Sequence, residues 1–309
     1  MDIKDRIRGG MIGLLVGDAL GVPYEFHARE SIPAMDEIEF EPPAAFRRAH
    51  AGTPAGTYSD DGAQALILLD SLLERGRFDA AHFAGGLCDW YDRGSMAVDG
   101  RVFDVGIQTA DAIRLLRRGV EPLLAGGADE YSNGNGALMR VLPLALWHRG
   151  TDVELVADAF DQSAVTHGHR RSQICCALYC LWARRIVENA ENPWAAAVET
   201  FGAMFPEETI ERTELDTRIF PKNADYEIRG GGYVVDSLRA ARVLAAEDSY
   251  EMTVKRAVAL GDDTDTTACI AGGIAGLIHG HEAIPARWRA ALRGRELYEP
   301  PIEKLLALY

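Results

Sequence analysis

The sequence predicts an all-α protein, and three observations support this fold class. Apolar residues recur at i, i+3 and i+4 spacing along most of the 309-residue chain, alternating β-branched runs are almost absent, and glycines follow several periodic segments where a helix would end. No segment has the composition of a linker. We therefore expect a single multi-helix domain over residues 1–309.

The periodic segments define the expected helices in chain order. They span residues 3–19, 60–75, 103–118, 136–149, 152–165, 169–188, 194–204, 232–246, 250–260, 266–279 and 302–308. Several are followed by a glycine where a left-handed residue commonly ends a helix: Gly76, Gly119, Gly150 and Gly280. Segment 205–231 is polar, charged and poorly periodic, so we expect a long excursion over the surface.

Glycines recur every four residues near both ends of the chain. The two sets are Gly9, Gly13, Gly17 and Gly21, and Gly272, Gly276 and Gly280. A glycine inside a helix costs about 1 kcal/mol relative to alanine. Close approach of two helix backbones would explain the repeats, and helices that are merely rich in glycine are the alternative. We expect helices 3–19 and 266–279 to be neighbours in the core, closer than the ~8–10 Å typical of helix pairs.

Composition and charge limit the classes of function. The net charge of −15 disfavours nucleic acid as a partner and requires any anionic substrate to be held by helix N-termini, glycine-rich turns or bound cations. No apolar stretch approaches the ~20 residues of a membrane span. The apolar run 11–16 is too short for an export signal, so we expect a cytoplasmic protein without a membrane partner. The five cysteines lack CxxC spacing and lie among apolar residues, which indicates reduced core side chains.

Two acidic clusters stand at the starts of apolar helical runs: SDD at 59–61 and DTDT at 263–266. Ser and Asp are common helix N-caps, so each cluster alone fits a capping motif. If the fold brings both together, four carboxylates surround one point, and only cations between them would hold such like charges close. Ligands made only of oxygen select hard cations such as Mg²⁺, Mn²⁺ or Ca²⁺. The clusters therefore suggest a metal site.

Two further segments have the composition of ligand-binding loops. SNGNG at 132–136 precedes the run ALMRVLPLALW, and such a turn at a helix start presents several N–H donors to an anion. An ordinary turn is the alternative. THGH at 166–169 holds a histidine pair without another Cys or His at zinc-ligand spacing. A polar contact to substrate or a helix cap is therefore the better interpretation of this pair.

Seven motifs form a series along nearly the whole chain. They are GLLVGDALGVPYEF (13–26), YSDDGAQAL (58–66), GRVFDVGIQT (100–109), SNGNGALMRVLPLAL (132–146), THGHRRSQ (166–173), GGYVVDSLRAA (231–241) and GDDTDTTACIAGGIAGLIHG (261–280). In this order they resemble the motifs of the ADP-ribosylglycohydrolase family. Each motif alone is weak, but the ordered set is specific and favours the metal-site interpretation of both acidic clusters.

The resemblance implies an all-α fold with two divalent cations, Mg²⁺ or Mn²⁺, in a cleft. The family hydrolyses the bond between C1″ of the distal ribose and a protein side chain, most often arginine and sometimes serine. The expected partner is therefore an ADP-ribosylated protein or a small ADP-ribosyl conjugate, with ADP-ribose as the product. Carried onto this sequence, the metal ligands are Ser59, Asp60, Asp61, Asp263, Asp265 and Thr266.

The resemblance also implies catalytic and substrate-binding residues. It places Glu25 at the metal centre. Coordinated carboxylates are held ionised and make poor proton donors, so Glu25 is our first candidate for the acid/base residue and Asp104 is the second. On the substrate side, the loop Ser132, Asn133, Gly134, Asn135 and Gly136 would bind the pyrophosphate. His167 would contact the substrate, and Tyr233 would offer an aromatic face to adenine. Core packing is an equal alternative for Tyr233.

Some positions depart from the commoner family pattern. Ser59 and Gly62 stand where a TDDT motif has threonines, and Asp262 adds a carboxylate beside the second cluster. These differences remove no ligand, but they weaken any inference about which acceptor is cleaved. The motif GDALGVPYEF is nearer to the arginine-directed branch.

Two other classes of function stay open. A non-catalytic ADP-ribose binder or a crystallin-like structural relative would share the fold, and a turnover assay separates them from an enzyme. Residues 263–267 also match the DxDxT pattern of other hydrolases, which requires a preceding hydrophobic strand. The preceding VKRAVAL predicts a helix, which argues against that class.

Overall fold

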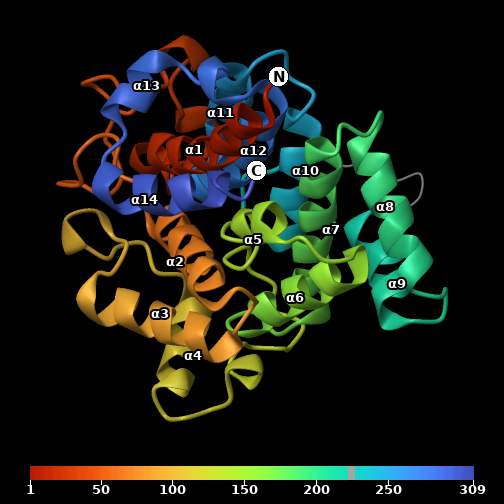
Figure 1. Ribbon diagram of the computed structural model, residues 1–309. Coiled ribbons are helices and arrows are strands. Elements are labelled where there is room, and N and C mark those ends of the chain that lie inside the picture. The colour runs from red at the N-terminus through yellow and green to blue at the C-terminus, as the bar shows by residue number, and fades with distance from the viewer. Residues whose placement is uncertain (222–226) are drawn as a thin grey trace.

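Helices make up nearly all the regular structure of the chain (Figure 1). The computed structural model describes residues 1–221 and 227–309. The α-helices are α1 Ile3–Gly21, α2 Asp60–Arg75, α3 Ala80–Arg93, α4 Ile107–Leu116, α5 Leu142–Trp147, α6 Asp152–Ala164, α7 Arg170–Val187, α8 Pro193–Met204, α9 Ile210–Glu214, α10 Val234–Leu244, α11 Tyr250–Val258, α12 Thr264–His279, α13 Ala286–Ala291 and α14 Arg295–Leu306. Within the described ranges, β-type pairing is limited to two isolated bridges, Gly127 with His167 and Gly134 with Tyr233. The predicted all-α class is confirmed.

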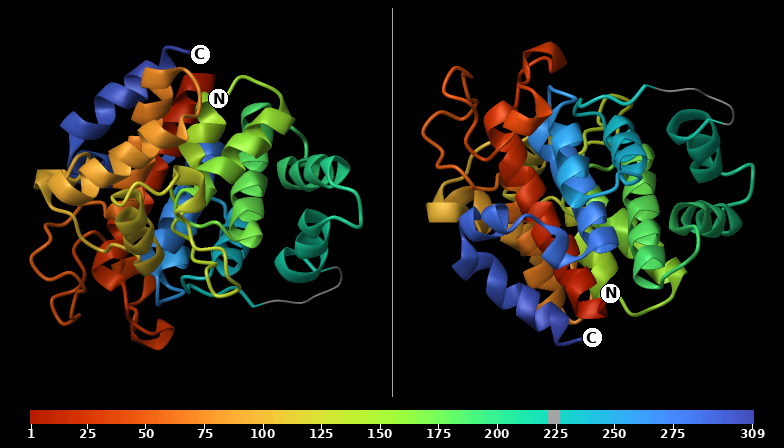
Figure 2. Two further views of the ribbon diagram at one scale, coloured as in Figure 1. Left: turned by 90° about the horizontal axis from the view of Figure 1, so that it is seen from below. Right: turned by 90° about the horizontal axis from the view of Figure 1, so that it is seen from above.

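Helices α1 and α12 lie side by side at the centre of the molecule and run in opposite directions (Figure 2, right). A Cβ atom placed on Gly13 would lie 2.5 Å from the carbonyl oxygen of Gly272. Gly9 and Gly276 approach each other still more closely. The two backbones are therefore in direct contact, which confirms the neighbours expected from the glycine repeats. Any larger residue at these positions would push the helices apart.

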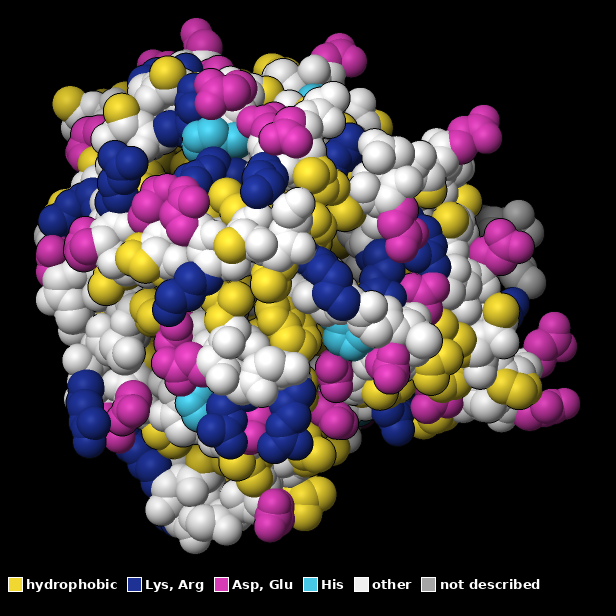
Figure 3. All heavy atoms as spheres, in the orientation of Figure 1, with side chains coloured by type: hydrophobic (Ala, Val, Ile, Leu, Met, Phe, Trp, Pro, Cys, Tyr) yellow, Lys and Arg dark blue, Asp and Glu magenta, His cyan; other side chains and the backbone are white. Residues whose placement is uncertain are grey.

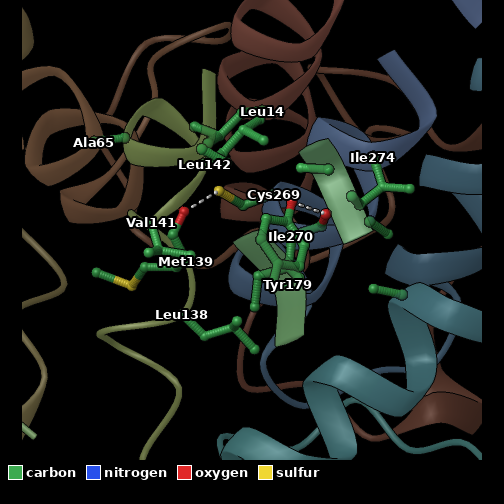
Figure 4. Packing of buried hydrophobic residues seen from close by; sticks show 14 of the residues in the cluster. Leu14, Ala65, Leu138, Met139, Val141, Leu142, Tyr179, Cys269, Ile270 and Ile274 are labelled. Carbon is green, nitrogen blue, oxygen red and sulfur yellow. Dashed lines mark hydrogen bonds between the residues drawn. The ribbon is translucent and has the colours of Figure 1, made fainter. Parts of the chain in front are cut away.

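Helix α12 forms the centre of the hydrophobic core. Besides α1, it packs against α7, α10 and α11. The Tyr179 hydroxyl of α7 donates a hydrogen bond of 2.8 Å to the Ile270 carbonyl oxygen, and Cys269 Sγ donates one of 3.6 Å to the Met139 carbonyl oxygen (Figure 4). Since neighbours surround α12, its N-terminal residues are fixed in position.

The remaining helices form two flanks around this centre. α2 packs against α3, α5 and α14, whereas α7 packs against α6, α8 and α9. In the views of Figures 1 and 2, α8 and α9 lie on the outer side of α7. The last helix, α14, packs against the first. Arg8 of α1 donates a hydrogen bond of 2.6 Å to Glu299 of α14.

Three helices, α3, α9 and α13, are absent from the sequence prediction, and α14 begins earlier than predicted. α3 contains adjacent glycines, Gly85 and Gly86, which weaken a helical pattern, and α13 is only six residues long. The predicted helix 302–308 starts after two prolines, because proline normally ends a helix. The observed α14 instead includes Pro300 and Pro301.

The predicted helices 103–118 and 136–149 are too long at their N-terminal ends. α4 begins only at Ile107, since Asp104 has a left-handed backbone with φ of 57°. Residues 136–141 are irregular because other groups take their carbonyl oxygens. Gln162, for example, donates to the Ala137 carbonyl oxygen at 3.2 Å.

The prediction that residues 205–231 form a long excursion over the surface is partly wrong. It contains α9 and a π-helical turn, Leu215–Ile219, whose first and last residues are buried against the core. Apolar side chains in this polar segment thus anchor it. Residues 222–226, which also fall in the predicted excursion, lie outside the described residues.

The surface carries mixed charge and the cysteines are free. On the face shown in Figure 3, positive and negative side chains intermingle, so the net charge of −15 does not form one patch there. All five cysteines are free thiols and four of them are buried, as predicted. In the described ranges, no helix has both the length and the apolar character needed to cross a bilayer.

The glycine contact predicts which alanine substitutions are tolerated. Gly276→Ala should destabilise the protein by about 1–3 kcal/mol, because its new methyl group would meet the Gly9 carbonyl oxygen. Gly85→Ala is the matched control, since its methyl group would meet nothing within 4 Å, and it should be neutral or stabilising by up to about 1 kcal/mol. Thermal unfolding measures both. Equal stability of the two variants would contradict the packing argument.

Candidate metal centre and substrate cleft

A cleft of about 490 Å³ opens where the N-terminal ends of α2 and α12 meet. Its walls come from both helices, from the start of α4 with the residues 104–106 before it, and from the loops around residues 25, 134–136 and 232. Most of the candidate residues line it: Glu25, Asp60, Asp61, Asp104, Gly134, Asn135, Gly136, His167, Asp263 and Thr266. Among the other candidates, Ser59, Ser132, Asn133, Tyr233 and Asp265 do not line this cleft.

The fold brings the two acidic clusters together. The Thr266 hydroxyl of α12 donates a hydrogen bond of 3.4 Å to Asp61 of α2. Carboxylate oxygens of Glu25, Asp263 and Asp265 all lie within 4.8 Å of one another. The two clusters are thus in contact through Thr266 and Asp61, and Glu25 lies beside the second cluster.

Asp18, which the sequence interpretation did not single out, fixes the start of α2. Its buried carboxylate accepts hydrogen bonds of 2.8 Å from the backbone N–H groups of both Ser59 and Gly62. Burial raises the pKa of Asp18 to about 7, against the effect of these hydrogen bonds. Ser59 is the N-cap of α2, with its hydroxyl oxygen accepting from the Asp61 N–H at 3.3 Å. Its position as a lone aspartate within the apolar run of α1 is the sequence signal that could have revealed Asp18.

Two carboxylate oxygens of the site lack a hydrogen-bond partner. Asp61 Oδ2 and Asp265 Oδ2 are buried and accept no hydrogen bond. Burial, reinforced by neighbouring carboxylates, raises the pKa values of Asp60, Asp61 and Asp265 well above their ordinary range. An unpaired buried carboxylate is costly unless it is protonated or meets a cation. With oxygen ligands on two facing helix starts, the residues fit a hard divalent cation.

A buried arginine supports Asp60 through a glutamine. Arg140 is fully buried and donates to the Gln64 side-chain oxygen at 2.8 Å, and Gln64 in turn donates to Asp60 Oδ2 at 2.8 Å. Arg140 also donates to the Thr166 hydroxyl at 2.7 Å, which lies 2.8 Å from His167 Nδ1. One guanidinium thus connects the metal side of the cleft with the substrate side. The sequence interpretation missed Arg140 because the predicted helix gave it no special place.

Glu25 has a histidine partner that the sequence interpretation also missed. His50 Nε2 lies 2.5 Å from Glu25 Oε2 and 3.8 Å from Asp104 Oδ1. Burial and the nearby carboxylates raise the pKa of Glu25 to about 10, while burial lowers that of His50. The rings of Phe26 and Phe103 flank His50, with centroids 5.5 and 5.1 Å away. The two acid/base candidates thus meet at one imidazole.

The SNGNG loop contributes only its second half to the cleft. The Ser132 hydroxyl donates a hydrogen bond to the Asp129 carboxylate, and the Asn133 side-chain nitrogen donates one to the Glu130 carbonyl oxygen. Both residues therefore stabilise the loop itself. Asn135 donates to Asp263 Oδ2 at 2.8 Å and therefore orients a candidate metal ligand.

The two candidate substrate-binding residues with aromatic rings, His167 and Tyr233, lie in different environments. His167 is buried and lines the cleft, and burial lowers its pKa to about 3, which leaves it neutral. A Cβ atom on Gly136 would lie 2.9 Å from the His167 ring, so a glycine is needed there. Tyr233 is 36% exposed, and its hydroxyl accepts a hydrogen bond from Arg171 at 3.2 Å. Its ring is thus not core packing.

Fold and site together define an α-helical protein with an oxygen-lined cleft suited to divalent cations. The family follows from comparison with known proteins. The sequence model of ADP-ribosylglycohydrolases matches residues 1–309, and the chain belongs to that family of enzymes, which hydrolyse glycosidic bonds of ADP-ribose. The DxDxT alternative fails on structural grounds, because the helix α11 precedes Asp263 where that motif needs a strand.

Named relatives cover nearly the whole chain. An ADP-ribosylarginine hydrolase of Pseudomonas putida, Tri1, is 32% identical over 92% of this chain and 73% of its own length. The ADP-ribosyl-[dinitrogen reductase] glycohydrolase of Rhodospirillum rubrum is 28% identical over 94% of this chain and 91% of its own. A solved structure of an ADP-ribosylglycohydrolase-related protein complex superimposes with a TM-score of 0.77 and 30% identity, covering 100% of this chain and 98% of that one.

The buried carboxylates in and beside the cleft predict a pH-dependent response to metal. A carboxyl group whose pKa is raised by folding stabilises the protein below its unfolded pKa of about 4, and this contribution is lost as the pH rises through the folded pKa. The metal-free protein should therefore lose stability toward neutral pH, where Asp18 has its pKa of about 7. Mg²⁺ should restore this stability if it binds the ionised carboxylates, because a ligand of the native state stabilises that state.

The measurement is the melting temperature with EDTA and with Mg²⁺ between about pH 5 and pH 8. The difference between the two curves should grow as the pH rises. A difference of zero, or one independent of pH, would show that these carboxylates do not bind the ion.

Proposed function

We propose that this protein hydrolyses the bond between ADP-ribose and an arginine side chain, with divalent cations bound by the two acidic clusters. The convergence of Glu25 with both clusters in one cleft carries this proposal. The arginine linkage rests on the relative at 32% identity, which is named an ADP-ribosylarginine hydrolase.

The metal ligands would be the oxygen-bearing residues around the unpaired carboxylates. These are Asp60, Asp61, Asp263, Asp265 and Thr266, with the Ser59 hydroxyl available beside them. When bound, Mg²⁺ or Mn²⁺ would orient the ribose hydroxyls and a water molecule and offset negative charge. Asp18, Arg140 and Asn135 would hold the ligands in place.

Glu25 is the proposed acid/base residue. Cleavage at C1″ passes through an oxocarbenium-like centre and needs both proton transfer and a nearby negative charge. Glu25 lines the cleft and is only 5% exposed, and its contact with His50 fixes the orientation of its carboxyl group. Asp104, on the other side of His50, is the second candidate.

The remaining cleft residues would bind the ADP-ribose part. The backbone at Gly134 and Gly136 would approach the pyrophosphate, where a side chain would collide with Gln108 or His167. The Gln108 side-chain nitrogen is buried without a partner and lines the cleft, so it offers a free donor to substrate. Neutral His167 would contact the substrate, and Tyr233 would offer its partly exposed ring to adenine.

Two other functions remain as outcomes of the assay. Hydrolysis of a serine linkage would use the same cleft, but the part that contacts the acceptor side chain would differ. A non-catalytic ADP-ribose binder or structural relative is disfavoured because the sequence retains every candidate ligand and the candidate acid/base residue Glu25.

Substituting the two acid/base candidates tests the mechanism. Glu25→Gln should lower kcat on an ADP-ribosyl-arginine conjugate by roughly 10²-fold or more, with little change in ADP-ribose affinity, because it removes the ionisable oxygen and keeps the shape. Asp104→Asn should have a smaller effect. Asp70→Asn, on α2 but outside this cleft, is the control.

The assay is run with Mg²⁺ and with EDTA, on arginine and serine conjugates. Wild-type rates for Glu25→Gln together with an inactive Asp104→Asn would transfer the acid/base role to Asp104. Turnover of only the serine conjugate would overturn the proposed substrate, and undiminished turnover in EDTA would overturn the metal requirement.

A further inference from the structure

Phe26 is an aromatic residue held out of the core at the mouth of the cleft. It is 70% exposed although it directly follows the buried Glu25. Phe26 also lines the same cleft as Glu25 and Asp104.

A strained backbone keeps Phe26 in this orientation. Its φ is 63°, a left-handed conformation that is unusual for a bulky residue. Phe26 N–H donates to the Asp262 carbonyl oxygen at 2.8 Å, and Asp262 N–H donates to the His27 carbonyl oxygen at 2.7 Å. Asp262 is itself left-handed, with φ of 58°. Strain of this kind persists where the surrounding structure fixes it, and it is frequent at functional sites.

The surroundings of Phe26 suit a planar cation. Its ring lies 5.5 Å from that of His50, which contacts Glu25 and lies 5.1 Å from the ring of Phe103. The Asp104 carboxylate lies 3.8 Å from the same imidazole. An aromatic face beside a carboxylate attracts a guanidinium group through stacking and charge together. A serine side chain or a flat neutral base carries no positive charge, so it gains less from the carboxylate than a guanidinium does.

We propose that Phe26 is a specificity-determining residue that stacks on the guanidinium of the arginine acceptor, on the leaving-group side of the cleft. This inference rests on the proposed function and deepens it. Adenine lies at the other end of the substrate, so Phe26 should act on the conjugate and not on free ADP-ribose.

The test compares wild type with Phe26→Ala, Phe26→Trp and Leu124→Ala. Phe26→Ala should lower kcat/KM for an ADP-ribosyl-arginine conjugate about five- to tenfold, mainly through KM, the range expected for a lost cation–π contact. Inhibition by free ADP-ribose should stay unchanged. Phe26→Trp should restore activity because it keeps an aromatic face. Leu124→Ala removes another exposed apolar side chain, 74% exposed and outside the cleft, and should behave as wild type.

Three results would overturn the inference. Equal loss of ADP-ribose inhibition in Phe26→Ala would place the ring on the ADP-ribose side. An unchanged KM, or equal damage from the alanine and tryptophan variants, would remove the stacking role. If the wild-type enzyme does not cleave the arginine conjugate but cleaves the serine one, the proposed function itself fails, and that outcome is read without any variant.

Discussion

Buried carboxylates that face one another with little positive charge nearby are the constraint on which this structure depends. Asp61 and Asp265 each have a buried oxygen that accepts no hydrogen bond, which is costly for an ionised carboxylate. Folding alone does not favour such an arrangement, since burial and mutual repulsion both raise the carboxyl pKa values. A divalent cation would resolve both costs, so the metal hypothesis explains why the residues are arranged in this way.

The core of the protein is organised to hold that arrangement. The glycines of α1 allow direct contact with α12, and the last of them, Gly21, touches the backbone at Thr264 and Asp265. Asp18 on the same helix fixes the first turn of α2. One helix thus sets the positions of both acidic clusters, and its own continuation carries Glu25 to the same cleft.

Local signals in the sequence were sufficient for the fold class, the central helix pair and the two acidic clusters, because helical periodicity, glycine spacing and clustered carboxylates are local patterns. Glu25 and Asp104 came from the resemblance to a known family. The sequence was insufficient for Asp18, Arg140 and His50. Their roles depend on residues 25 to 76 positions away along the chain, as in the bonds of His50 to Glu25 and Arg140 to Gln64. Such contacts arise only from tertiary packing, so no local pattern reveals them.

The most direct test of the central claim is the number of metal ions that the protein binds. Equilibrium dialysis against Mn²⁺ should give about two ions per chain, the stoichiometry of two-metal hydrolytic sites. Asp61→Asn should bind fewer ions, whereas Asp70→Asn on the same helix should bind as many as wild type. Absence of Mn²⁺ binding, or an unchanged number of ions in Asp61→Asn, would contradict the claim that the buried carboxylates are held together by metal.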